Sequence, residues 1–265
     1  MSIEQIIVLA VVQGITEFLP ISSSGHLVLI PYLTGWPDQG QFTDVMMHLG
    51  TLLAILIYFW RDVLRLAAGT LELLGGKVTR EGKLAAYIVL ATIPAVIFGL
   101  FLKKSGFADL ERNVVVVTFN TFFYGVLMLV ADYVGKQTRT MEDMTLKSAI
   151  FIGVAQALAL IPGTSRSGVT MTAGRFLGFT RPEAARFSFL LGIPAMLGAG
   201  VLTLGDALAA GDKISSDSFL CAGLTFFAGL AAIAFLMALV KRVSFLPFVI
   251  YRMVLAGFLT VLLLS

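Results

Sequence analysis

Two short polar stretches decide how this chain folds: Glu17-Phe-Leu-Pro-Ile-Ser-Ser-Ser-Gly-His26 and Pro162-Gly-Thr-Ser-Arg-Ser-Gly168. The first interrupts an apolar region at residues 3–36, and the second interrupts another at residues 146–179. The apolar arms that remain have roughly 10–17 residues, whereas a helix needs about 20 to cross a bilayer. Irregular backbone at membrane depth is tolerated only where protein or a watery cavity surrounds it. Both regions are therefore predicted to form re-entrant helix pairs.

The composition places the chain in a membrane. Hydrophobic residues make up 58% of its 265 residues, charged residues make up 13%, and the mean hydropathy is +0.93. Soluble domains average about 25% charged residues, so lipid must cover much of this apolar surface. The net charge of +3 is small, and we attribute it to cytoplasmic loops rather than to a nucleic-acid partner.

Six further segments are apolar and long enough to span a bilayer: residues 42–60, 84–102, 114–131, 187–204, 219–240 and 245–264. Cations gather in the expected loops at residues 61–83 and 132–148, just beyond the second break, and after residue 240. Such segments face the cytoplasm. We therefore predict an all-α polytopic membrane protein with about six transmembrane helices, two re-entrant helix pairs and both termini outside.

The two polar breaks also match each other. A shift of 143 residues places Gln13 on Gln156, and it aligns Ser22, Ser24 and Gly25 with Ser165, Ser167 and Gly168. This match predicts a single integral membrane domain, residues 1–265, with internal repeats at about 1–131 and 146–265. Because the breaks open from opposite sides, the repeats have inverted topology, and their shared site lies near the membrane midplane.

Ionisable groups inside a membrane are costly and are functional candidates by default. Gln13 and Glu17 are four residues apart, so they share one face of a helix. A carboxylate and an amide oxygen suit a hard divalent cation such as Mg²⁺. A helix cap or a polar contact between helices is the alternative interpretation of this pair.

The breaks also carry groups suited to phosphate. Helix N-termini bind anions through their free N–H groups, and Arg166 adds a planar, permanently charged guanidinium. The expected phosphate-binding residues are Ser22, Ser24, Gly25, Thr164, Ser165, Ser167 and Gly168. A serine beside a histidine offers a nucleophile and a base, and the histidine could itself attack. Close packing of small residues between helices is the alternative, although it leaves Arg166 and Glu17 unexplained.

Several familiar sites are absent from the sequence. It contains neither a P-loop nor a His-Glu-x-x-His zinc motif. Ser24-Gly-His26 and Ser165-Arg166 look like pieces of the vanadium-haloperoxidase-type lipid phosphatase motifs. That family needs a second histidine six residues past the arginine, and Thr172 occupies the position here. We reject that assignment.

The strings from Gln13 to His26 and from Pro162 to Gly168 closely resemble the undecaprenyl pyrophosphate phosphatase family linked to bacitracin resistance. The likeness covers essentially the whole chain and includes Pro182-Glu-Ala-Ala-Arg-Phe-Ser-Phe-Leu-Leu-Gly-Ile-Pro194. The family is described by a Glu/Gln-x-x-x-Glu motif, which this chain meets with Gln13 and Glu17. It therefore offers one carboxylate where the motif can hold two.

This resemblance implies a phosphatase, dependent on Mg²⁺ or Ca²⁺, in the bacterial cytoplasmic (inner) membrane. Such an enzyme removes the terminal phosphate of a C55 polyprenyl diphosphate at a site open to the periplasm. It leaves the monophosphate carrier used in cell-wall synthesis. Glu17, Ser23, His26 and Arg166 match the family's functional positions, and Gln13 joins Glu17 at the metal. We favour attack by Ser23 with His26 assisting, while His26 or water as nucleophile stays open.

Some questions stay open at this level. A polyprenyl-phosphate flippase could use the same midplane site without chemistry. The oligomeric state is open between a monomer and a homodimer. Arg252, in the last span, is expected to pair with a carboxylate, contact headgroups or snorkel. Asp44 and His48, at i and i+4, are expected to have a structural hydrogen-bonding role.

Overall fold

The computed structural model describes residues 1–105, 113–209 and 215–264. Within these residues the regular elements are helices, and the strand-like pairing is limited to an isolated bridge between Arg139 and Phe179. The helices are α1 (Ile3–Thr16), α2 (Ser23–Thr34), α3 (Gln41–Tyr58), α4 (Trp60–Leu74), α5 (Arg80–Ser105), α6 (Val114–Val134), the 3₁₀ helix η2 (Met141–Asp143), α7 (Leu146–Leu158), α8 (Arg166–Phe176), α9 (Arg181–Ala209), α10 (Ser216–Leu239) and α11 (Leu246–Leu264).

Six described helices are long and apolar enough to cross a membrane: α3, α5, α6, α9, α10 and α11. This confirms the predicted number of spans. Helices α5 and α9 extend farthest beyond their expected ranges, 84–102 and 187–204. Hydropathy marks only the part of a helix that suits lipid, whereas both helices begin with charged turns at Arg80 and Arg181.

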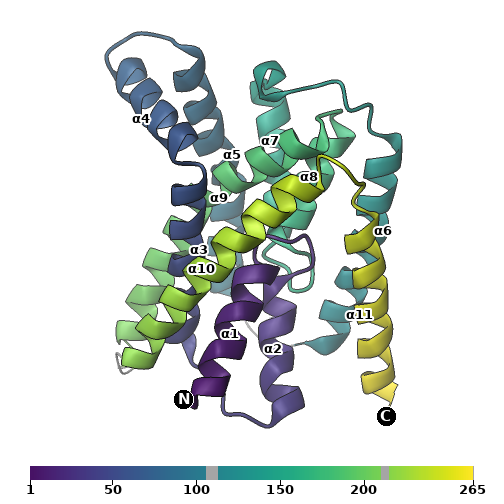
Figure 1. Cartoon of the computed structure of the whole chain (residues 1–265). Helices are drawn as coiled ribbons and strands as arrows, with labels where there is room; N and C mark the ends of the chain where they lie inside the picture. Colours follow the sequence, from purple (N-terminus) through teal and green to yellow (C-terminus); the bar gives the residue numbers. More distant parts are fainter. Residues whose placement is uncertain (106–112, 210–214, 265) are drawn as a thin grey trace.

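The charged segment 61–83, expected to form a loop, is largely helical instead. Its first part is α4, and its last residues already belong to α5. A Cβ built on Gly69 would lie 2.5 Å from the backbone nitrogen of Gly82, so α4 and α5 pack at backbone contact. Figure 1 shows the resulting hairpin at the end of the molecule opposite the two termini.

The four shortest α-helices lie as two pairs in opposite halves of the molecule. In Figure 1, α1 and α2 lie in the half that holds both chain termini, whereas α7 and α8 lie in the other half. Each polar break begins in the connection within its pair, residues 17–22 or 159–165, and continues into the first turn of α2 or α8. The two breaks touch, because the Ser167 Oγ donates a hydrogen bond of 3.1 Å to the backbone oxygen of Leu19.

Close helix contacts fix the elements around the first break. A Cβ on Gly14 would lie 2.6 Å from the Cβ of Ala228, so α1 packs tightly against α10. A Cβ on Gly50 would lie 2.3 Å from the backbone oxygen of Ala222, so α3 packs tightly against α10 as well. Helix α10 therefore holds α1 and α3 at fixed positions beside each other.

The basic segments gather at the end opposite the termini. Arg80 pairs with Glu142 at 2.9 Å, and the Arg186 Nε lies 3.1 Å from a carboxylate oxygen of Asp62. These pairs join the α4–α5 hairpin to η2 and to the start of α9. The clustering agrees with the predicted assignment of these segments to one side of the membrane.

Asp132, near the end of α6, is the centre of a buried ionic network. Its Oδ1 accepts hydrogen bonds from the Nε atoms of Arg175 at 3.0 Å and Arg181 at 2.7 Å. Its Oδ2 accepts a bond of 3.0 Å from the backbone nitrogen of Phe245. The side chain of Arg175 is completely buried. One carboxylate therefore ties α6 to α8, α9 and the start of α11.

We expect Asp132→Ala to lower the free energy of unfolding by about 3–5 kcal/mol, because it leaves a buried guanidinium without its counter-charge. Thermal unfolding in detergent measures the effect. Glu142→Ala serves as the control, since the Arg80–Glu142 pair is exposed and such pairs contribute about 0–1 kcal/mol. Equal melting temperatures for the two variants would contradict this account of the network.

Candidate active site

Both connections, residues 17–22 and 159–165, end in a serine with positive φ. Ser22, which precedes α2, has φ 76°, and Ser165, which precedes α8, has φ 71°. Among the described non-glycine residues only Gln137 shares this property. A non-glycine residue in a sparsely populated backbone region costs about 1–3 kcal/mol. The residues that the 143-residue shift aligns thus carry the same strained backbone, and each starts a helix.

The second break is held against α6. Gly163 has φ +83°, and a Cβ there would lie 2.4 Å from the backbone oxygen of Val117. The Asn120 Nδ2 donates a hydrogen bond of 2.9 Å to the backbone oxygen of Pro162. Glycine is therefore required at position 163 both by its conformation and by this close approach.

Arg252 on α11 joins the two breaks to α6. Its side chain is fully buried, and its guanidinium donates to five backbone carbonyl oxygens. The Nε bonds Thr121 at 3.0 Å, Nη1 bonds Pro20 at 3.3 Å and Thr164 at 3.1 Å, and Nη2 bonds Asn120 at 3.1 Å and Gly163 at 2.9 Å. None of the three expected roles of Arg252 matches this arrangement, because its described partners are backbone carbonyl groups.

Glu17 lies where the two breaks meet, and it is buried. The Arg166 Nη2, from the second break, donates to its Oε1 at 3.0 Å. The Ser23 Oγ donates to its Oε2 at 2.8 Å, and the Gln13 Nε2 lies 3.2 Å from the same oxygen. The structure thus brings four predicted residues, Gln13, Glu17, Ser23 and Arg166, into one cluster.

A fifth residue completes this cluster from α3. The Nε2 of His48 lies 3.7 Å from the Oε2 of Glu17. About 40% of the His48 side chain is exposed, against 14% for Arg166 and 7% for Glu17, so the cluster has an accessible side at His48. We call Gln13, Glu17, Ser23, His48 and Arg166 the Glu17 cluster.

His26 has different neighbours. Its Nδ1 lies 2.6 Å from the backbone oxygen of Ser22, and its Nε2 lies 2.5 Å from the hydroxyl of Tyr251. The two rings are stacked, with centroids 5.7 Å apart. A carbonyl oxygen only accepts hydrogen bonds, so neutral His26 carries its proton on Nδ1 and accepts from Tyr251. The described hydrogen bonds of His26 therefore do not include Ser23, the residue whose attack His26 was predicted to assist.

The other predicted phosphate-binding residues lie in or next to the two strained turns. Ser22, Thr164, Ser165 and Ser167 are buried. The Ser165 Oγ accepts a hydrogen bond of 3.2 Å from the backbone nitrogen of Gly168 and so caps α8. Gly25 has room, since a Cβ there would meet nothing nearer than 3.5 Å. The side chain of Ser24 lies outside the described part of the structure.

Comparison with known proteins identifies the family. Residues 6–258 match the family described as bacitracin resistance protein BacA. The chain belongs to this family. A protein of Erythrobacter litoralis named undecaprenyl-diphosphatase is 48% identical to it over 95% of this chain and 96% of its own length. Proteins of the same name in Jannaschia sp. and Roseobacter denitrificans are 47% and 46% identical, each over at least 98% of both chains.

Within this BacA-family chain, sequence reasoning missed three residues of the site. His48 does make the expected local hydrogen bond, from Nδ1 to the backbone oxygen of Asp44 at 2.7 Å, but its other nitrogen faces Glu17. The other two residues are Tyr251, which contacts His26, and its neighbour Arg252, which contacts both breaks. The available signal was the presence of polar side chains inside apolar helices, and it does not say which partners the fold supplies.

The Glu17 cluster offers donors for a divalent cation. The Oε1 of Gln13 is buried and lacks a hydrogen-bond partner within the described structure. It lies on the same amide as the Nε2 that contacts Glu17. No group of three or more His, Cys, Asp and Glu side chains suited to a metal occurs among the described residues, so a cation held here would need the Gln13 amide and the Ser23 hydroxyl as donors as well. Oxygen donors of these kinds fit Mg²⁺ or Ca²⁺, which also take water and phosphate oxygens.

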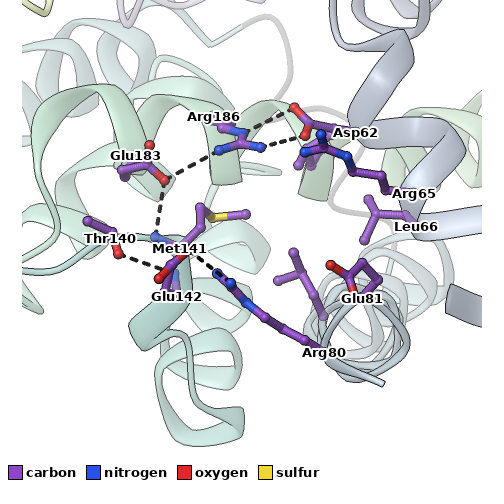
Figure 2. Close-up of a pocket in the computed structure, with 12 residues that line it drawn as sticks. Asp62, Arg65, Leu66, Arg80, Glu81, Thr140, Met141, Glu142, Glu183 and Arg186 are labelled. Carbon is purple, nitrogen blue, oxygen red and sulfur yellow. Dashed lines mark hydrogen bonds and ion pairs between the residues drawn. The ribbon is translucent and has the colours of Figure 1, made fainter. Parts of the chain in front are cut away.

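A cavity of about 420 Å³ lies away from the Glu17 cluster, at the end of the molecule opposite the termini. Figure 2 shows that Arg186, Asp62, Glu183, Arg80 and Glu142 form ion pairs around it. Its lining holds three arginines against four carboxylates, so it offers no excess positive charge for a diphosphate. We therefore place the candidate active site at the Glu17 cluster.

Proposed function

We propose that this chain is an undecaprenyl-diphosphatase, which hydrolyses the terminal phosphate of a C55 polyprenyl diphosphate to give the lipid monophosphate. One structural observation carries this proposal. A carboxylate, a hydroxyl and a guanidinium from two breaks far apart in sequence meet at Glu17. Membership of the BacA family and the names of relatives that match nearly the whole chain support the same activity.

The reaction that the cluster supports begins at Ser23. Its hydroxyl already donates to Glu17, so the carboxylate can take the proton as the oxygen attacks the terminal phosphorus. The bond from that phosphorus to the bridging oxygen breaks, and the prenyl monophosphate leaves with the electron pair. Water then attacks the phosphoserine and loses its proton to solvent. The bond from phosphorus to the Ser23 oxygen breaks, Glu17 returns its proton to that oxygen, and inorganic phosphate leaves. Water activated directly by Glu17 would give the same products in one step.

Arg166 supplies the fixed positive charge of this site. Its Nη1 also approaches the backbone oxygen of Ser188 at 3.4 Å, and it fits against Gly192, where a Cβ would lie 2.1 Å from that nitrogen. The guanidinium is therefore held at the start of α8, whose N-terminus also favours anions. Catalysis of phosphoryl transfer depends mainly on positioning and electrostatic stabilisation, and this arrangement provides both.

A divalent cation, Mg²⁺ or Ca²⁺, is part of the proposal. Gln13 and Glu17 would hold it, and when bound it would neutralise phosphate oxygens. The charges support this part of the proposal, because Glu17 and Arg166 cancel each other while a diphosphate brings several negative charges. Gln13 and Glu17 would thus place the positive charge of the ion beside the phosphorus that Ser23 attacks.

We also propose the placement of the chain in the bacterial inner membrane. The pairs α1–α2 and α7–α8 would be re-entrant, and the halves 1–131 and 146–265 would be inverted repeats of one domain. The matching strained serines and the opposite positions of the pairs (Figure 1) support this arrangement. The basic segments would face the cytoplasm, which would leave the α1–α2 side and the site open to the periplasm. We do not propose lipid transport, since the relatives' names state a phosphatase activity.

Phosphate release from a C15 or C55 prenyl diphosphate by detergent-purified protein tests the activity. We expect release with Mg²⁺ or Ca²⁺, its loss with EDTA, and a fall of at least about 10²-fold in Glu17→Gln, which lacks the proton acceptor. Failure of the folded wild-type protein to release phosphate with either metal would refute the proposed function.

The same assay separates the roles of Ser23 and His26. Ser23→Ala should remove turnover if this hydroxyl is the nucleophile, whereas direct attack by water would leave measurable release. His26→Ala with near wild-type turnover would exclude His26 from the reaction.

A further inference from the structure

We infer that His48 is a protein ligand of the divalent cation, beside Gln13 and Glu17, an inference that rests on the proposed function. The starting observation is the gap between the His48 Nε2 and the Glu17 Oε2, which is 3.7 Å wide. This distance exceeds that of a hydrogen bond. His48 comes from α3, and Gln13 and Glu17 come from α1 and its end, so an ion held in this gap would join two elements that α10 already fixes.

The hydrogen bonding of His48 leaves the correct nitrogen available. Its Nδ1 lies 2.7 Å from the backbone oxygen of Asp44, and a carbonyl oxygen can only accept, so Nδ1 carries the proton. The neutral ring then presents a lone pair at Nε2, toward Glu17. A bond from one ring nitrogen to a backbone carbonyl is the usual way in which proteins orient a metal-binding histidine.

The spacing of the two donors is close to that of two ligands on one ion. Imidazole nitrogen and carboxylate oxygen each bind a transition metal at about 2.1 Å, which places two such donors about 3.0–3.4 Å apart for angles from 90° to tetrahedral. The observed 3.7 Å lies a few tenths of an ångström beyond this range. The unpartnered Oε1 of Gln13 belongs to the amide whose nitrogen lies 3.2 Å from the same Glu17 oxygen. A carboxylate oxygen and an imidazole nitrogen therefore face one gap, and the Gln13 amide lies beside the same carboxylate oxygen.

An imidazole ligand changes which metals the site prefers. Mg²⁺ and Ca²⁺ favour oxygen donors throughout, whereas imidazole favours transition metals, with affinity rising from Mn²⁺ toward Cu²⁺. The chain presents only one carboxylate here, so the nitrogen of His48 supplies a donor that a second carboxylate would otherwise provide. The expected consequence is tighter binding of Mn²⁺ or Co²⁺ than of Mg²⁺.

Pulsed electron paramagnetic resonance of the Mn²⁺-loaded protein tests the assignment, because a directly bound imidazole gives a ¹⁴N modulation. The chain contains only two histidines, His26 and His48, so a protein purified without a histidine tag has two possible sources. We expect the modulation in the wild type and in His26→Gln. We expect its loss in His48→Gln, with the Kd for Mn²⁺ raised by about 10-fold or more.

The outcomes separate this inference from the proposed function. Modulation that persists in His48→Gln, or its absence from Mn²⁺-loaded wild type that releases phosphate, would overturn the ligand role and leave the phosphatase intact. The same holds if a protonated His48 merely pairs with Glu17, since Mn²⁺ would then bind without a nitrogen signal. Modulation from a wild type that hydrolyses no prenyl diphosphate would retain the ligand and refute the phosphatase. His48→Asn provides a second test if His48→Gln does not purify as a folded protein.

Discussion

Replacing Arg166 by glutamine is expected to lower kcat/KM for a prenyl diphosphate by about 10³-fold or more. An arginine that stabilises a phosphoryl group in transfer contributes about 10³–10⁵-fold to kcat in other enzymes. Here the guanidinium is only 14% exposed and lies 3.0 Å from the carboxylate beside the attacking hydroxyl, so water can replace it poorly. Steady-state phosphate release, with folding checked by thermal unfolding, measures the loss.

Two further variants show whether the shape or only the charge of Arg166 matters. Arg166→Lys keeps one positive charge but loses the planar fork that binds phosphate oxygens in pairs, so we expect partial activity. Arg65→Gln serves as the control, because Arg65 lines the cavity at the end opposite the termini, away from the Glu17 cluster. We expect wild-type turnover from this variant. Similar kcat/KM values for Arg166→Gln and Arg65→Gln would remove Arg166 from the catalytic site.

The pair of Arg166 and Glu17 should also behave as a coupled unit. Removing Arg166 leaves a buried carboxylate without its counter-charge, and removing Glu17 does the same to the guanidinium. The combined Glu17→Gln and Arg166→Gln change is therefore expected to cost less stability than the sum of the two single changes. The comparison is made with melting temperatures in detergent.

Local sequence patterns predicted the parts of this protein that depend on local physics. Lengths of apolar sequence predicted six spans, and the two polar breaks located the connections at residues 17–22 and 159–165. The cost of an ionisable group in a membrane singled out Glu17 and Arg166, which the structure places 3.0 Å apart. The expected loop at 61–83 was wrong because charge was read as absence of structure, whereas α4 is an amphipathic helix.

What the sequence could not supply is the set of partners that tertiary packing creates. His48 has a sufficient local explanation in its bond to Asp44, four residues earlier, and nothing local indicates that Glu17 lies opposite its other nitrogen. Arg252 was expected to seek charge or lipid. Its carbonyl partners, contributed by α6 and by both breaks, become available only when these segments converge.

This convergence makes Arg252 the second residue whose change is expected to have a large effect. Its five N–H donors meet five carbonyl oxygens, two from α6 and three from the breaks. Hydrogen bonds to a charged group contribute about 1.5–3 kcal/mol each, and an unsatisfied buried carbonyl costs a similar amount. Lysine has only three donors and no planar fork, so Arg252→Lys cannot satisfy the same oxygens.

We expect Arg252→Lys to lower both the melting temperature and kcat, the latter by about 10²-fold per folded molecule, because a displacement of about 1 Å in a positioned group can cost that much. Arg175→Lys is the matched control. Arg175 is equally buried and also bonds backbone carbonyls, but its network centres on Asp132. It should lower the melting temperature while kcat per folded molecule stays near the wild-type value.

The comparison of these two variants distinguishes positioning from general stability. If Arg252→Lys loses only stability, like Arg175→Lys, then the breaks hold Ser23 and Arg166 in place without help from α11. If kcat falls in Arg252→Lys alone, the active-site geometry depends on a guanidinium that touches neither Ser23 nor Glu17 among the described contacts. The physical reason would be that two strained turns, each ended by a serine with positive φ, need a common donor to fix them relative to each other.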